Sequence, residues 1–185
     1  MAVRDIVLFA DNQDALRRRS EPVQAVNRRV KNLVEDLKDT LAHQPEGIGL
    51  AAPQIKVHHR VIVVRLGGGS GGQMEPGPPI ALINPQIIET GYEEKDFDGC
   101  LSFPGLFAET VRPHLLRVTG LDEWGQSFEC IFGGFDAVVV HHEIDHLDGV
   151  LFIDRVERVE DLYQVRAADN GHLVRVPVSV IAGTQ

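Results

Sequence analysis

The sequence predicts an α+β domain in which mainly antiparallel sheets pack around a central helix, with an amphipathic helix near the N-terminus. Three observations predict this class: an apolar stripe with helical spacing, several stretches rich in β-branched residues, and a second helical stretch that follows them. Strands followed by the helix that packs on them are typical of α+β domains. At 185 residues, the chain is expected to form one domain over 1–185.

The composition is that of an ordinary globular protein, with 43% hydrophobic and 24% charged residues. The formal net charge of -9 argues against direct nucleic-acid binding through broad neutralisation of phosphates. No apolar stretch approaches the roughly 20 residues that a membrane helix needs, so no membrane association is expected. The cysteines, Cys100 and Cys130, are too few for a disulfide framework, and a cytoplasmic location is expected.

The first predicted helix follows an extended N-terminal segment. Ser20, Glu21 and Pro22 resemble a helix start, where a capping residue is followed by proline in the first turn. Apolar residues then recur at spacings of three, four and seven, which places them on one face of a helix. They are Val23, Val26, Val30, Leu33, Val34, Leu37 and Leu41. We expect this face to pack against the core.

Strands are predicted where β-branched residues are frequent or where apolar and polar residues alternate. These stretches are 60–66, 80–90, 111–121, 126–132 and 172–181. The segment 67–79 between the first two is rich in glycine and proline, which predicts a flexible surface loop. Chemically informative motifs lie on both sides of this loop, which favours a loop within one domain over a domain boundary.

A second helix is predicted between Gly134 and Asp148. Because a helix returns to the same face every three to four residues, His142 and His146 point the same way. Two imidazoles at this spacing can bind one divalent metal ion, and Glu143 would lie beside a water whose pKa the metal lowers toward ~7. The His-Glu-x-x-His pattern therefore predicts a metal-dependent hydrolase and makes the central helix a metal-binding helix.

A third metal ligand must come from elsewhere in the chain. The extended metzincin pattern needs a histidine six residues after the second one, and Phe152 stands there. Glu157 or Glu160 would instead complete a zinc endopeptidase of thermolysin-like type. Cys100 is the better candidate, because Gly99 allows close backbone approach and a thiolate would complete a His₂Cys set with one position open. A non-catalytic structural His₂Cys site would usually need a fourth protein ligand.

The segment 47–54, Gly-Ile-Gly-Leu-Ala-Ala-Pro-Gln, is a third motif. Its small residues let the backbone approach a ligand or another backbone closely. Gln54 offers an amide that could hydrogen-bond a substrate oxygen. Taken alone, the segment predicts only a tight turn that enters a strand.

Together, the three motifs resemble the signature motifs of peptide deformylases, in the same order and with the same gaps. They are 47–54, 98–102 (Asp-Gly-Cys-Leu-Ser) and 141–149 (His-His-Glu-Ile-Asp-His-Leu-Asp-Gly). The resemblance implies a hydrolase that removes the formyl group from N-formylmethionyl nascent polypeptides. It also implies one divalent metal ion, most often Fe²⁺, with Zn²⁺, Ni²⁺ or Co²⁺ tolerated.

The resemblance also implies the roles of individual residues in catalysis. The metal ligands would be Cys100, His142 and His146. Glu143 would be the general base and later the acid that protonates the departing amine. Formyl-oxygen binding is implied for the remaining two catalytic groups, the Gln54 amide and the Leu101 backbone N–H.

Substrate binding is implied for the Gly49 backbone, beside an apolar slot for the methionine side chain. The slot candidates are Phe103, Phe135, Val138 and Val139. An arginine downstream of the cysteine motif pairs in the family with the aspartate of the metal helix; these are Arg112 and Asp145 here. That pair would steady the metal ligands.

The sequence departs from the family pattern at several positions. Asp98 stands where glutamate is usual, His141 replaces a common glutamine, and Phe107 stands where many bacterial members carry an arginine that contacts the peptide. The long basic C-terminal helix through which some members dock on the ribosome is missing. At most a transient contact with the ribosome is therefore expected.

Overall fold

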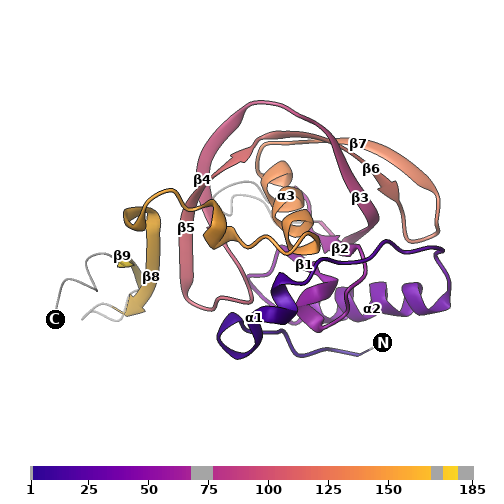
Figure 1. Cartoon of the computed structure of the whole chain (residues 1–185), viewed down its shortest axis with the longest axis horizontal. Helices are drawn as coiled ribbons and strands as arrows, with labels where there is room; N and C mark the ends of the chain where they lie inside the picture. Colours follow the sequence, from indigo (N-terminus) through magenta and orange to yellow (C-terminus); the bar gives the residue numbers. More distant parts are fainter. Residues whose placement is uncertain (1, 68–76, 168–172, 179–185) are drawn as a thin grey trace.

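The computed structural model describes residues 2–67, 77–167 and 173–178. In these parts of the chain, α-helices and two antiparallel sheets surround a buried helix (Figure 1). The helices are α1 (Phe9–Arg17), α2 (Arg28–Ala42) and α3 (Phe135–Leu147). The short 3₁₀ segments are η1 (Ala52–Ile55), η2 (Phe152–Arg155) and η3 (Val159–Asp161). The predicted α+β class with antiparallel sheets is confirmed.

One sheet has five strands and the other has four. The five-stranded sheet has the order β1 (Gly49–Ala51), β2 (Val61–Val64), β3 (Ile80–Thr90), β6 (Leu115–Leu121) and β7 (Ser127–Gly133). The four-stranded sheet has the order β4 (Glu93–Gly99), β5 (Leu106–Pro113), β8 (Leu162–Ala167) and β9 (Leu173–Pro177). Neighbouring strands are antiparallel throughout both sheets.

Helix α3 lies between the two sheets, and every residue from Ala137 to Leu147 is buried. A helix that is enclosed on all sides needs apolar residues around most of its circumference. Val139, Val140 and Ile144 supply them by packing against the five-stranded sheet in one core cluster. The polar residues on the remaining face of α3 are therefore also held away from water, which sets the environment of the histidines.

Helix α2 starts seven residues later than the predicted helix start at Ser20, so that part of the prediction is wrong. Asn27 is the N-cap, and its side chain accepts hydrogen bonds from the backbone of Arg29 and Val30 at 2.9 and 3.2 Å. The chain before it is not helical because other partners hold its backbone. Glu21 bonds to His58 and Arg60 on both sides, and the Asn84 side chain bonds the N–H and C=O of Val23.

The predicted strand at 111–121 is two strands that belong to different sheets, so the single strand is wrong. The chain turns between them at His114, whose N–H donates to Tyr92 O at 2.8 Å. Pro113 before it has no N–H to donate, which favours the end of a strand there. The strand predicted at 80–90 has the same bounds in the structure.

Some predicted strands are shifted in the structure, and some observed elements were not predicted. The strands predicted at 60–66 and 126–132 are close to β2 and β7, and β9 lies within 172–181, whose remaining residues lie largely outside the described parts. Most of the predicted loop 67–79 also lies outside them. Helix α1 was expected to be extended chain, and β4 and β8 were not predicted. Among the described residues, no helix is long and apolar enough to cross a membrane.

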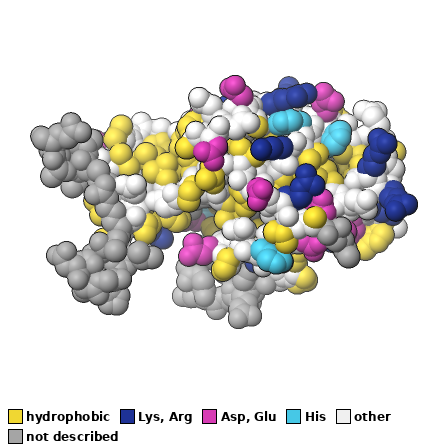
Figure 2. All heavy atoms as spheres, turned by 90° about the horizontal axis from the view of Figure 1, so that it is seen from below, with side chains coloured by type: hydrophobic (Ala, Val, Ile, Leu, Met, Phe, Trp, Pro, Cys, Tyr) yellow, Lys and Arg dark blue, Asp and Glu magenta, His cyan; other side chains and the backbone are white. Residues whose placement is uncertain are grey.

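Figure 2 shows the side of the molecule on which α1 and α2 lie, with basic and acidic side chains interspersed. Exposed ion pairs of the described residues include Arg4 with Asp36 and Arg18 with Glu21. Such exposed pairs each contribute little to stability, about 0–1 kcal/mol. The described fold therefore depends mainly on the buried contacts of the helices and sheets.

The position of the α2 start can be tested by removing the two candidate caps. Asn27→Ala should lower the free energy of unfolding by about 1 kcal/mol, because two N–H groups of the first turn lose their acceptor. Ser20→Ala is the matched control, since the Ser20 hydroxyl has no hydrogen-bond partner in the described structure. Urea unfolding followed by circular dichroism measures both. A larger loss for Ser20→Ala would contradict the assigned start.

Candidate metal centre

Three potential metal ligands meet where the end of β4 approaches α3. The ligand atoms of Cys100, His142 and His146 all lie within 4.8 Å of one another. Cys100 Sγ is 3.2 Å from His146 Nε2, and the two imidazole rings are 4.9 Å apart at 72°. No other group of this kind is found in the described residues. The spacing of the two histidines on α3 and the loop after β4 together produce this convergence.

The orientation of His142 is fixed by a carboxylate. Its Nδ1 lies 2.7 Å from Asp98 Oδ1. An ionised carboxylate only accepts hydrogen bonds, so Nδ1 donates and Nε2 is left to bind a metal ion. Burial alone would raise the pKa of Asp98, but the neighbouring His142 and Arg112 hold it below its ordinary value.

The donor set and its surroundings fit a divalent cation. Burial and the neighbouring His142 hold the pKa of His146 well below its ordinary value, so its imidazole is neutral, as a metal ligand must be. Burial lowers the pKa of His142, but Asp98 and Cys100 raise it well above the ordinary value. These groups thus favour positive charge at His142 Nε2, which a cation held by the three ligands would supply. Two imidazoles and a thiolate suit first-row divalent ions.

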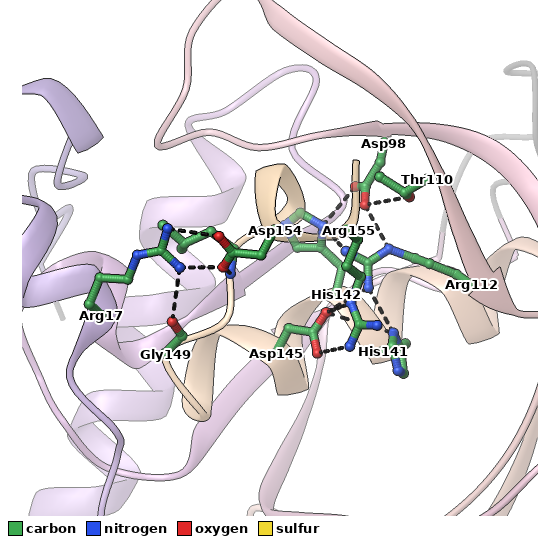
Figure 3. A network of polar contacts seen from close by, with 11 residues as sticks. Arg17, Asp98, Thr110, Arg112, His141, His142, Asp145, Gly149, Asp154 and Arg155 are labelled. Carbon is green, nitrogen blue, oxygen red and sulfur yellow. Dashed lines mark hydrogen bonds and ion pairs between the residues drawn. The ribbon is translucent and has the colours of Figure 1, made fainter. Parts of the chain in front are cut away.

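Arg112 is fully buried and joins the two acidic residues of the site (Figure 3). Its Nε donates to Asp98 Oδ2 at 2.6 Å, and its Nη1 donates to Asp145 Oδ2 at 2.7 Å. The expected contact between Arg112 and Asp145 is therefore present. Thr110 donates a further hydrogen bond to Asp98 at 3.1 Å. Strand β5 thereby positions both the partner of His142 and the residue before His146.

Asp145 has a second cationic partner in Arg155 of η2 (Figure 3). Arg155 Nε and Nη2 each lie 2.6 Å from a different oxygen of Asp145, which is a bidentate pair. Burial would raise the pKa of Asp145, but Arg155 and Arg112 together lower it. His141 Nδ1 lies 2.7 Å from Arg112 Nη1 and must accept there, and burial lowers the pKa of His141 to about 4.

Glu143 lies against β1 with one oxygen available. Its side chain is 5% exposed, and burial raises its pKa to about 7. Glu143 Oε2 has no hydrogen-bond partner among the described residues. A Cβ atom on Gly49 would come within 2.4 Å of Glu143 Oε1. Only glycine at position 49 leaves Glu143 in this place.

Gln54 brings an amide to the other side of the cysteine. It belongs to η1, and its Oε1 accepts the backbone N–H of Ala51 at 2.8 Å. This fixes the amide so that Nε2 points to Ser102 Oγ at 3.2 Å and Cys100 Sγ at 3.5 Å. Leu101, the other residue expected to bind the formyl oxygen, directly follows Cys100. The site is thus built from β1, η1, the loop after β4, and α3.

Comparisons with known proteins agree with this arrangement. The family model described as polypeptide deformylase matches residues 3–161. The chain belongs to the peptide deformylase family. It is 41% identical over 157 residues to a peptide deformylase of Aquifex aeolicus, covering 84% of this chain and 88% of the relative.

Solved structures of family members superpose on most of the chain. The peptide deformylase of Thermotoga maritima has a TM-score of 0.75 at 36% identity, covering 85% of this chain and 100% of that one. The Ehrlichia chaffeensis enzyme in complex with actinonin has a TM-score of 0.76 at 36% identity, covering 85% and 91%. The chain therefore shares the fold of these family members as well as their motifs.

The apolar residues expected to line the methionine slot do not all share one cluster. Val139 and Phe135 belong to the cluster between α3 and the five-stranded sheet. Val138 is buried on the same helix. Phe103 instead packs with Phe9 and Phe152 in a separate cluster. Phe103 and the α3 candidates Phe135 and Val139 therefore lie in different apolar clusters, and Cys100 packs against the cluster of Phe103.

Two residues of the site were missed by the sequence reasoning. Asp98 was noted only as a departure from the family pattern, although it directly orients His142. Its position two residues before the candidate ligand Cys100 was the one local signal that it lies near the metal site. Arg155 was not noticed at all. No local pattern points to it, because its partner Asp145 lies on another element.

Removing the buried guanidinium should destabilise the fold more than removing an exposed one. Arg112→Met leaves two buried carboxylates without their shared cation, so the free energy of unfolding should fall by about 3–5 kcal/mol. Arg117→Met is the matched control, because Arg117 pairs with Glu89 and Glu129 at the surface. This substitution should lower the free energy of unfolding by only about 0–1 kcal/mol. Urea titrations of both variants give the values. Equal losses would show that the Arg112 network contributes no special stability.

Proposed function

We propose that this chain is a metal-dependent amide hydrolase that removes the N-terminal formyl group from N-formylmethionyl nascent polypeptides and releases formate. The observation that carries the proposal is the convergence of Cys100, His142 and His146 beside Glu143, in a chain of the peptide deformylase family. A single catalytic domain over 1–185, a cytoplasmic location and at most a transient contact with the ribosome belong to the same proposal.

Cys100, His142 and His146 would hold one divalent cation, since their ligand atoms lie within 4.8 Å of one another. When bound, the ion supplies Lewis acidity that polarises the formyl group and lowers the pKa of water. Fe²⁺ is the proposed ion, and Zn²⁺, Ni²⁺ or Co²⁺ suit the same donors. The hydrogen bond from His142 to Asp98 keeps the ring in the orientation that ligation requires.

Glu143 moves the protons of the reaction. Its carboxylate takes a proton from the attacking water and later gives it to the amine that departs from the formyl carbon. The unpartnered Oε2 is free to make this contact. Contact with Gly49 holds the side chain in place, so the base does not need to be reoriented during the reaction.

Gln54 and Leu101 stabilise the negative charge that develops on the formyl oxygen. The Gln54 amide has its carbonyl fixed by Ala51, which leaves Nε2 as the donor toward the substrate. The Leu101 backbone N–H is the second donor. The substrate main chain binds the Gly49 backbone, and the candidates for the methionine slot are Phe103, Phe135, Val138 and Val139.

Two other readings of the metal motif receive less support. A zinc endopeptidase would use Glu157 or Glu160 as third ligand, but both are exposed, and the named relatives are peptide deformylases. A structural four-ligand site would need His141 as fourth ligand, and its Nδ1 already accepts a hydrogen bond from Arg112. The hydrolase therefore remains the proposal.

Formate release tests the function directly. The protein is purified without oxygen, its metal content is measured, and formyl-Met-Ala-Ser is supplied as substrate. Wild type should release formate. Glu143→Gln should retain the metal and lose roughly 10²–10⁴-fold in kcat, because the proton acceptor is gone. A folded, metal-loaded wild type that releases no formate would contradict the proposal, and full activity of Glu143→Gln would remove Glu143 from its role.

Gly49→Ala should impair the reaction without removing the metal. The added Cβ meets Glu143 and moves the base, so kcat should fall by roughly 10²-fold. Gly133→Ala is the matched control, because a Cβ there meets nothing within 4 Å, and it should keep near wild-type activity. Steady-state kinetics and metal analysis of both variants test this. Unchanged kcat in Gly49→Ala would show that Glu143 tolerates the displacement.

A further inference from the structure

The N-terminal segment 7–9 crosses both loops that carry the proposed formyl-oxygen donors. The backbone N–H of Val7 donates to Gln54 O at 2.8 Å. The backbone N–H of Phe9 donates to Ser102 O at 3.0 Å. Gln54 and Ser102 are 48 residues apart in sequence, and the same short segment bonds to both.

The geometry of the segment explains how it reaches two loops at once. Leu8 is extended, with φ -87° and ψ 141°. In an extended chain, residues two apart direct their N–H groups to the same side. Phe9 is also the first residue of α1, where an N–H has no acceptor within the helix. Both donors are therefore free to bind the neighbouring loops.

The Phe9 side chain adds an apolar anchor at the same place. Its ring stacks on Phe103 with centroids 4.7 Å apart, and Phe103 meets Phe152 edge to face at 5.1 Å. Phe103 directly follows Ser102 in the loop that contains Cys100 and Leu101. The ring contact and the backbone bond thus hold the same loop at adjacent residues.

We propose that residues 7–9 set the separation between the Gln54 amide and the Leu101 backbone N–H, and that Phe9 is a positioning residue for formyl-oxygen binding. The inference rests on the proposed function, which assigns these two donors. Oxyanion stabilisation depends on donors placed before the reaction begins, so a loosened loop lowers kcat more than it raises KM. Phe103 then serves as the anchor of Phe9.

Two substitutions at position 9 separate the ring from the backbone bond. Phe9→Ala removes the ring and keeps the N–H. Phe9→Pro removes both; proline suits the first position of a helix, and the extended Leu8 suits the residue before proline. Leu16→Ala is the matched control, because Leu16 is buried in the same cluster but lies at the other end of α1. Should Leu16→Ala not fold, Leu16→Val takes its place.

The measurements are kcat and KM for formate release, the metal content, the melting temperature, and hydrogen exchange in segments 52–55 and 100–103. We expect kcat to fall about 10-fold in Phe9→Ala and about 100-fold in Phe9→Pro, with KM within about 3-fold and wild-type metal content. Hydrogen exchange should rise in both segments. The control should melt at a lower temperature and keep kcat within about 3-fold of wild type.

Other outcomes overturn the inference. Unchanged kcat in Phe9→Pro would show that the donors keep their places without the segment. An equal loss of kcat in the control at the same melting temperature would reduce the effect to general stability. Unchanged hydrogen exchange in Phe9→Pro would overturn it even if wild type released no formate. Absence of formate from wild type alone would instead contradict the proposed function.

Discussion

The buried guanidinium of Arg112 is the constraint on which the rest of the site depends. Moving a cation out of water costs several kcal/mol unless its partners offset the cost. Arg112 meets Asp98 through one edge and Asp145 and His141 through another. A planar guanidinium can make these directed contacts together, whereas a lysine ammonium could not. Strands β4 and β5 and helix α3 are therefore held in one relative position.

The same network also determines which charges of the site are left without a partner. Arg112 and Arg155 offset the charges of Asp98 and Asp145. A half-buried Cys100 thiolate and a buried, ionised Glu143 would then remain without compensation. Their combined charge matches that of one divalent cation. Burial is the largest cause that raises the pKa of Glu143 to about 7.

The parts of this arrangement that follow local periodicity could be predicted from sequence. The helical spacing of His142 and His146 places them on one face, and β3 was predicted with its observed bounds because its β-branched residues form one run. The same local reasoning failed at Ser20, where Asn84, distant in sequence, bonds the backbone of the neighbouring Val23 and keeps it extended. It also failed at His114, where the chain passes from β5 in one sheet to β6 in the other.

Helix α1 contributes to the site but could not be predicted from its own sequence. Only Leu16 is buried in it, so its sequence carries almost no apolar stripe. Contacts with residues far along the chain hold α1 in place. Arg17 pairs with Asp154 and also donates to Gly149 O (Figure 3). Gly149 has φ +75°, and a Cβ there would overlap the backbone of Arg17.

The neighbouring residues Asp154 and Arg155 connect this contact to the buried network. Asp154 faces α1, and Arg155 reaches Asp145 on α3. An exposed pair such as Arg17 with Asp154 contributes little stability by itself. Its effect is to fix where η2 lies, and η2 carries the second cation of Asp145. The N-terminal residues are therefore coupled to α3 through η2 and contact the segments that contain Gln54 and Ser102.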